Sequence, residues 1–171
     1  PPDVVRSVFA DAFSRGGGHA RVPGTGDTAT VRDVALLFGT AAHALDFDDV
    51  HHRMGGHPSA PVLAAALPIA EREGRSGRSF LRSFILGTEV ELVLADILNP
   101  GHYERGWHPT AVLGSMGAAA AVGALLDLDA SALQSALGLA ASRASGTKGN
   151  FGTMTKPFHV GDAARNGLEA A

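Results

Sequence analysis

The sequence predicts an all-α fold, a bundle-like domain of about six helices. Apolar residues recur at intervals of three and four along several stretches, which is typical of one face of a helix. No run of β-branched residues alternates with polar residues over more than a few positions, so strands have little support. The 171 residues include 30 Ala and 22 Gly, and small side chains at helix contacts let two helix axes approach closely.

The first helices follow from the apolar spacing of the N-terminal third. Residues 4–14 place apolar side chains on one helix face. Gly and Pro are dense over residues 15–28, which predicts a loop. A second helix is expected over residues 31–45, with Thr28 or Thr30 as its N-cap.

Further helices fill the rest of the chain. Pro68 lies inside the helix expected over residues 60–73 and is expected to kink or divide it. Residues 101–109 are expected to be a loop, and a Gly-rich connector over residues 146–163 leads into a last helix. The other expected helices are residues 60–73 capped by Ser59, 77–98 capped by Ser76, 110–128 capped by Thr110, and 130–145 preceded by Asp129.

The composition excludes several classes of protein. The absence of Cys excludes a disulfide scaffold, a zinc–thiolate site and a cysteine nucleophile. A net charge of −3 without a basic block argues against nucleic acid or an anionic membrane as a partner. The uncharged stretch 110–126 has 17 residues, mostly Ala and Gly, whereas a membrane span needs about 20 strongly apolar ones. We therefore expect a cytoplasmic protein in which this stretch is a buried helix.

Neither end of the chain resembles a natural terminus. The sequence starts without Met or a signal peptide, and it stops inside an Ala-rich helical pattern. Residues 1–171 are therefore expected to be part of a helical domain that is truncated at both ends.

An acidic run follows the helix expected over residues 31–45. Its carboxylates lie near a helix C-terminus, where they face the negative end of the helix dipole. A solvated loop, a metal site and an acid–base group in a carboxylate-processing site are three interpretations of this run. A metal site here would have no recognised spacing signature, and its ligands would be Asp46, Asp48, Asp49, His51 and His52.

Two tripeptides and one Lys supply further polar groups. His57-Pro58-Ser59 and His108-Pro109-Thr110 each precede an Ala-rich helix, where Pro and a hydroxyl residue are also ordinary helix-start residues. Lys156 lies in the Gly-rich connector and is a solvated side chain, a point charge for a substrate carboxylate, or a proton donor if burial lowers its pKa.

Taken in order, these motifs resemble the MmgE/PrpD family, which includes 2-methylcitrate dehydratase, cis-aconitate decarboxylase and iminodisuccinate epimerase. The resemblance implies a helical domain followed by an α+β lid domain, which is absent here, as well as homodimers and catalysis without a metal or an organic cofactor. The matching segments cover most of the chain from Thr28 onward and read HALDFDDVH, GHPSAPVLAAALPIAEREGRSGR, GTEVE, RGWHPTAVLGSMGAAAAV, ALGLAASRASG and TKPFHVGDAARNGLEAA.

The resemblance also implies roles for single residues, with His and Lys serving proton transfer and carboxylate binding. One difference is Val50, at a position where relatives often have Thr. We assign the catalytic positions to Asp46, His57, His108 and Lys156, and substrate binding to Asp48, Trp107 and His159.

The leading interpretation is a lyase of the 2-methylcitrate dehydratase type that acts on a small di- or tricarboxylate. Such chemistry needs cations to hold carboxylates and a base near neutral pH, and the unperturbed pKa of His lies closest to that range. A decarboxylase or an epimerase of the same family, acting on cis-aconitate or iminodisuccinate, would use the same groups. From another class, an inactive helical fragment would only mediate dimer contacts through its Ala and Gly faces.

Overall fold

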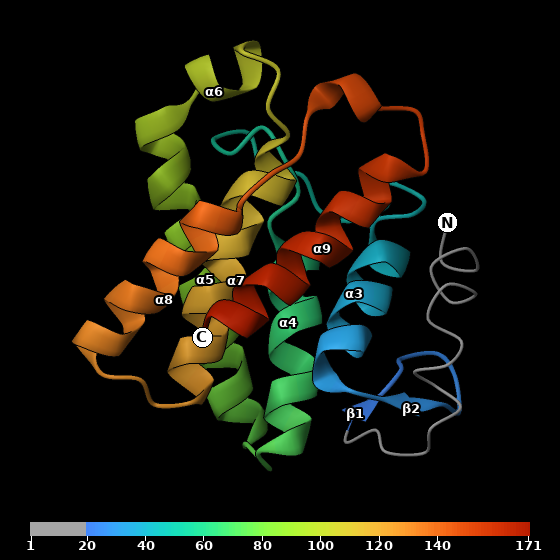
Figure 1. The fold of residues 1–171 in the computed structure, drawn as a ribbon, viewed down its shortest axis with the longest axis vertical. Helices are drawn as coiled ribbons and strands as arrows, with labels where there is room; N and C mark the ends of the chain where they lie inside the picture. Colours follow the sequence, from blue (N-terminus) through green and yellow to red (C-terminus); the bar gives the residue numbers. More distant parts are fainter. Residues whose placement is uncertain (1–19) are drawn as a thin grey trace.

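The computed structural model describes residues 20–171 as a helical bundle with one small sheet at its edge (Figure 1). Its long helices are α3 (Val31–Ala42), α4 (Ser59–Arg72), α5 (Gly77–Leu98), α7 (Pro109–Leu125), α8 (Ala130–Arg143) and α9 (Thr155–Ala170). Helix α7 packs against α4, α5, α8 and α9, and α3 packs against α4 and α9. The all-α prediction is confirmed, whereas the helix expected over residues 4–14 lies outside the described residues.

Helix α7 occupies the centre of the bundle because its sequence carries no charge and few large side chains. Of its 17 residues, 14 are buried, and most of these are Ala or Gly. These small faces are therefore used inside the domain, against four neighbouring helices. Among the described helices, α7 included, none combines the length and the hydropathy that crossing a membrane requires.

Helices α3 and α9 meet closely at two glycines. A Cβ on Gly39 of α3 would lie 2.8 Å from the Cα of Gly161 and 3.1 Å from the carbonyl oxygen of Val160. Because no side chain fits there, the two backbones are in direct contact. This contact holds the first turns of α9 beside the last turn of α3.

Two of the predicted helix caps, Thr30 and Ser76, are confirmed, and Asp129, which was expected only to precede its helix, is a cap as well. The side chains of Thr30, Ser76 and Asp129 accept hydrogen bonds from the backbone N–H three residues further on, at the starts of α3, α5 and α8. These caps satisfy backbone donors that have no partner within the helix.

The other two predicted caps are wrong. Ser59 is the first residue of α4, and the Asp49 carboxylate accepts hydrogen bonds from both its N–H and its hydroxyl. Thr110 lies inside α7, where its hydroxyl accepts a hydrogen bond from the N–H of His57 at 3.0 Å. In both cases a residue distant in the sequence supplies the hydrogen-bond partner, so local spacing could not reveal it.

The predicted division of a helix at Pro68 is wrong, and so is one predicted helix start. Helix α4 continues through Pro68, which is buried in the core, so packing offsets the lost backbone hydrogen bond. Helix α9 begins at Thr155, inside the predicted connector over residues 146–163. The connector was inferred from its glycines, but Gly161 lies inside the helix, where the close approach of α3 requires it.

Short elements appear in both predicted loops. Strands β1 (Ala20–Arg21) and β2 (Thr28–Ala29) pair antiparallel, with Ala20 opposite Ala29. Helix α6 (Gly101–Glu104) forms one turn. Two-residue strands and a single helical turn are too short to show a hydrophobic period in a sequence.

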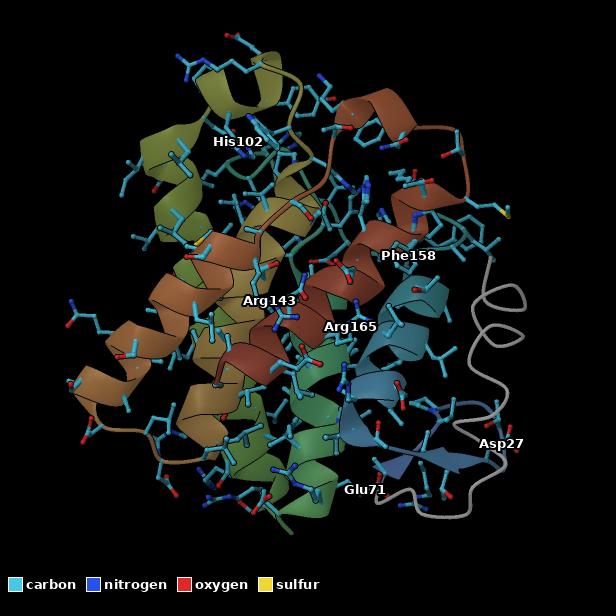
Figure 2. All side chains as sticks on the ribbon, in the orientation of Figure 1. Asp27, Glu71, His102, Arg143, Phe158 and Arg165 are labelled. Atoms are coloured by element: carbon cyan, nitrogen blue, oxygen red, sulfur yellow. The ribbon has the colours of Figure 1, made fainter. Side chains whose placement is uncertain are left out.

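Surface ion pairs connect neighbouring elements, and Figure 2 labels one partner of each of two such pairs, Glu71 and Arg143. The Arg21 Nε of β1 lies 2.5 Å from the Glu71 carboxylate of α4, and the Arg143 Nη2 of α8 lies 2.6 Å from the Glu169 carboxylate of α9. Exposed pairs of this kind contribute about 0–1 kcal/mol each. The stability of the bundle therefore depends mainly on the buried faces around α7.

Candidate functional site

Polar side chains gather at one end of the bundle, where α3 ends and where α7 and α9 begin. The loop after α3 and the segment before α4 complete this cluster. All of its members come from helix ends or adjoining loops, where a rigid scaffold can present side chains to one point. The members are His43, Asp46, Asp48, His57, His108, Lys156 and His159.

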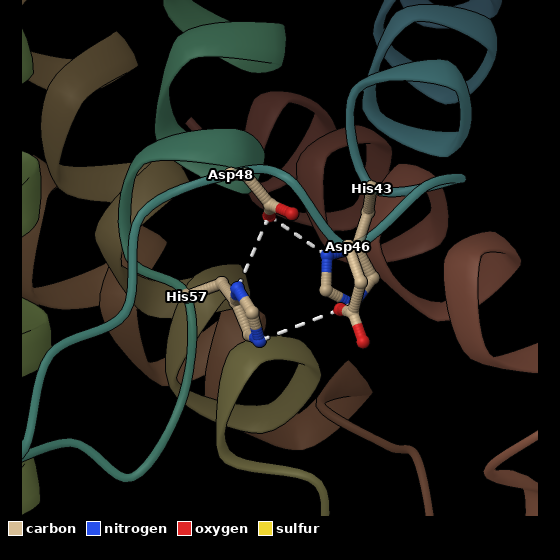
Figure 3. Close-up of side chains that lie close together, drawn as sticks. All are labelled: His43, Asp46, Asp48 and His57. Atoms are coloured by element: carbon tan, nitrogen blue, oxygen red, sulfur yellow. Dashed lines mark hydrogen bonds and ion pairs between the residues drawn. The ribbon is translucent and has the colours of Figure 1, made fainter.

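Two histidines and two aspartates form a closed ring of contacts (Figure 3). The Asp48 Oδ2 lies 2.7 Å from the His43 Nδ1 and 3.5 Å from the His57 Nδ1. On the opposite side, the Asp46 Oδ1 lies 3.7 Å from the His43 Nε2 and 3.6 Å from the His57 Nε2. The His43 and His57 rings meet edge to face with centroids 4.7 Å apart.

Lys156 extends this ring on the Asp46 side. Its ammonium donates a hydrogen bond to the Asp46 Oδ1 at 2.5 Å. This hydrogen bond lowers the pKa of Asp46 below its ordinary value, and partial burial opposes the effect. Asp46 has a positive φ of 60°, which turns the chain sharply after α3 and is more readily tolerated by Asp than by most residues.

His108 and His159 form a second pair beside the ring. Their Nδ1 atoms lie 3.2 Å apart, so one nitrogen donates and the other accepts. Burial lowers the pKa of His108 to about 3, and the neighbouring His159, His43, Lys156 and His57 add to the effect. Burial also lowers the pKa of His159. Both imidazoles are therefore neutral near pH 7 and available as bases.

The backbone around His108 fixes its position. Its N–H donates to the carbonyl of Gly146 at 3.1 Å, and its side chain is buried at the start of α7. The Phe151 ring stands edge-on to the imidazole, with centroids 4.9 Å apart, and the Lys156 Nζ lies 5.4 Å from the centre of the same ring. The Phe151 ring thus packs against the His108 imidazole.

The predicted site residues are mostly, but not all, brought together. Asp46, Asp48, His57, His108, Lys156 and His159 belong to the cluster. The Trp107 ring instead stacks on His102, with centroids 6.2 Å apart and the rings inclined by 15°. It does so although its backbone is next to His108.

The metal site that the acidic run suggested is not assembled from the expected residues. Asp49 is engaged with Ser59, the backbone of His51 pairs with that of Gly56, and His52 is exposed. In the described chain, Asp46 and Asp48 of the expected set lie instead with His43 and His57, and the possible ligand atoms of these four residues all lie within 4.8 Å of one another.

Imidazole and carboxylate would suit zinc, manganese or iron. However, Asp46 is already paired with the Lys156 ammonium and Asp48 with the His43 ring. A metal ion bound here would have to displace both contacts.

His43 is the site residue that the sequence interpretation missed. It follows Leu36 and Thr40 at helical spacing, and all three are buried. A histidine on the buried face of a helix that leads into an acidic run is the signal that could have identified it. The same position on an apolar face is also typical of an ordinary core histidine, so the pattern alone did not distinguish the two.

The cluster therefore combines several chemical capacities in one place. It has a Lys ammonium, neutral imidazoles with lowered pKa values, and carboxylates that orient both kinds of group. Cations can hold anionic substrate groups, and imidazoles can move protons at neutral pH. Proton transfer on a small, negatively charged molecule fits this set.

Comparisons with known proteins agree with the motifs. The MmgE/PrpD N-terminal domain matches residues 2–171. The chain is similar to cis-aconitate decarboxylase of Homo sapiens, with 37% identity over 142 residues that cover 80% of this chain and 29% of that protein. Cis-aconitate decarboxylase of Mus musculus is 36% identical over 141 residues, with the same coverage of 80% and 29%.

A fungal relative extends the match. Cis-aconitate decarboxylase of Aspergillus terreus is 32% identical over 163 residues, which cover 88% of this chain and 32% of that protein. The chain thus spans about 30% of the length of the curated relatives that it matches.

Proposed function

Because the chain belongs to the MmgE/PrpD family, we propose that the protein is a lyase acting on a small di- or tricarboxylate, with the decarboxylation of cis-aconitate as its reaction. The observation that carries this proposal is the grouping of Lys156 with four histidines and two aspartates at one end of the bundle. The names of the relatives favour decarboxylation over the dehydration expected from the sequence.

Decarboxylation of an unsaturated tricarboxylate makes specific demands on these residues. The bond between one carboxylate and its carbon breaks, CO₂ leaves, and the electron pair shifts through the neighbouring double bond. The carbon at the far end of that double bond then takes up one proton. The site must therefore bind the remaining carboxylates as anions and deliver one proton to carbon.

We assign carboxylate binding to Lys156, whose ammonium is held by Asp46 at 2.5 Å in the structure. A substrate carboxylate reaching Lys156 would compete with Asp46 for this cation. His57 and His108 serve proton transfer. An anionic substrate opposes the influence of the Lys156 ammonium on the pKa of His108, since an opposite charge favours the protonated imidazole.

Dehydration of 2-methylcitrate is the second candidate. It begins with the removal of a proton from a carbon next to a carboxylate, which requires a neutral base. The His108 and His159 imidazoles, whose pKa values are lowered by burial, provide that base without any change of protonation state.

The test is a product assay with the protein expressed from its complete gene. We would incubate it with cis-aconitate, 2-methylcitrate, citrate and iminodisuccinate and identify the products by NMR. The proposal expects loss of CO₂ from cis-aconitate. Products from 2-methylcitrate alone would support the second candidate, and turnover of none of the four would overturn both.

A pair of variants ties the activity to this site. Lys156→Met is expected to lower kcat/KM by about 10²–10⁴-fold, in the range found for groups that bind or transfer charge in the transition state. Lys148→Met is the matched control, because Lys148 lies over the Tyr103 ring, 3.4 Å from its centroid. Equal activity in the two variants would contradict the role of Lys156.

A further inference from the structure

We propose that His43 is a catalytic residue that exchanges a proton with the substrate through its Nε2, and that Asp48 is the positioning residue that fixes this ring. The inference rests on the proposed function and deepens it. It also changes the role of Asp48, which the sequence interpretation placed among substrate-binding residues.

The first step is the contact between the two side chains. The His43 Nδ1 lies 2.7 Å from the Asp48 Oδ2, and the His43 side chain is completely buried. An ionised carboxylate can only accept hydrogen bonds, so Nδ1 carries the hydrogen and donates it. With Nδ1–H fixed in this way, any proton gained or lost by the ring is exchanged at Nε2.

The second step is the surroundings of Nε2. This nitrogen is buried and has no hydrogen-bond partner among the described residues. The nearest charged oxygen, the Asp46 Oδ1, lies 3.7 Å away, which is too long for a hydrogen bond. A buried polar atom without a partner is uncommon in folded proteins and calls for an explanation. A ligand atom bound next to the His43 Nε2 would supply the missing hydrogen-bond partner.

The third step is the position of His43 within the cluster. Its ring centroid lies 4.7 Å from that of His57 and 5.9 Å from that of His108. The Asp46 Oδ1 that faces Nε2 also accepts the hydrogen bond from Lys156. A carboxylate substrate held by Lys156 would therefore lie beside the His43 Nε2.

Asp48 suits a positioning role better than a substrate-binding role. Its carboxylate is negatively charged and would repel the carboxylates of the substrate. Its side chain is only 10% exposed, and its Oδ2 is engaged with His43. A buried carboxylate on Nδ1 holds the imidazole in one orientation and stabilises the imidazolium that forms at Nε2, as in the Asp–His pair of serine proteases.

Whether the His43 ring gives or takes a proton depends on which of the two reactions the site performs. In decarboxylation, the carbon that receives the electron pair takes the proton from the His43 Nε2, in place of the direct transfer from His57 or His108 assigned above. The neutral ring regains a proton from solvent, which reaches the cluster on the Asp46 side, since the Asp46 side chain is 56% exposed. In dehydration, the His43 Nε2, rather than His108 or His159, removes the proton from carbon.

Three variants of the protein from its complete gene test the pair by kinetics. Asp48→Asn and His43→Gln are each expected to lower kcat by about 10²–10⁴-fold, with a much smaller change in KM. The double variant is expected to be no worse than either single one, because the two residues act as a unit. Asp49→Asn is the matched control, since Asp49 contacts Ser59 rather than a histidine, and it should keep kcat.

A second measurement does not depend on activity. NMR of the ¹⁵N-labelled imidazoles, with His43 assigned by its absence in His43→Gln, reports which nitrogen carries hydrogen. We expect hydrogen on Nδ1 in the parent protein and a changed His43 signal in Asp48→Asn. If His43→Gln fails to fold, Asp48→Asn provides the assignment.

The outcomes separate this inference from the proposed function. Turnover of cis-aconitate that survives both single variants overturns the inference and leaves the function standing. No turnover of any tested carboxylate, together with Nδ1–H in the NMR spectrum, overturns the function and leaves the Asp48–His43 pair standing. Hydrogen on Nε2 alone, or multiplying kinetic effects in the double variant, overturns the pair.

Discussion

The low pKa of His108 predicts that acid destabilises the fold through this one side chain. Burial and neighbouring histidines and Lys156 lower its pKa from 6.5 to about 3 in the folded protein. The depressed value means that the neutral ring stabilises the fold above pH 6.5, and this contribution is lost as the pH falls from 6.5 towards 3. The perturbation to test is therefore a change from pH 7.5 to pH 4.5.

The size of the effect follows from the two pKa values. At pH 4.5 the unfolded chain binds a proton at His108 almost completely, whereas the folded chain, with a pKa of about 3, binds very little. The unfolded state then gains about 2.7 kcal/mol relative to the folded state. The His108→Asn side chain cannot be protonated in this pH range, so the variant should not lose this part of the free energy of unfolding.

Urea unfolding of the parent protein and of His108→Asn at both pH values gives the assay. The difference between their free energies of unfolding should shift by about 2–3 kcal/mol in favour of the variant on acidification. Comparing the two proteins cancels the contributions of groups that do not contact His108. His52→Asn, at an exposed histidine, is the control and should run parallel to the parent. A shift below about 0.5 kcal/mol for His108→Asn would refute the reasoning.

Three further predictions follow from buried groups and close contacts. Burial, and then the nearby Asp49 charge, raises the pKa of Glu91 well above its ordinary value in the folded protein. The folded state therefore loses stability as the pH rises through this folded-state pKa, and Glu91→Gln should remove that loss. A parallel pH dependence of the urea midpoints of the parent and the variant would contradict this prediction. Gly161→Ala should destabilise the fold by about 1–3 kcal/mol because its Cβ would meet the backbone of α3. Gly138→Ala, which meets nothing within 4 Å in the middle of α8, should stabilise it by about 0.5–1 kcal/mol, and equal thermal midpoints for the two variants would count against the packing account. Finally, dialysis against a chelator should leave kcat unchanged, because Lys156 already serves as the cation on Asp46; activity restored only by an added metal would show otherwise.

Most of the helices could be predicted from the sequence because their apolar periodicity is local, whereas α7, which is buried on nearly all sides, was predicted from its uncharged sequence. The caps at Thr30, Ser76 and Asp129 were predictable for the same reason. The start of α9 was not, since the helix contains Gly161 for a contact with α3 that no local pattern records.

The site shows the same division between local and tertiary information. The motifs identified Asp46, His57, His108 and Lys156, and the structure brings all four close together. The 3.2 Å contact between His108 and His159 depends on how α7 meets α9. His43 was not predicted because a histidine at a buried helix position is usually structural. Only its contact with Asp48 distinguishes it from an ordinary core histidine.

The central claim is that this cluster performs lyase chemistry on a small polycarboxylate. The most direct test is proton NMR of cis-aconitate in D₂O with the parent protein and with Lys156→Met. The account predicts loss of CO₂ and one deuteron on the product carbon with the parent, and a rate lower by about 10²-fold or more with the variant. A product formed equally fast by both proteins would contradict it.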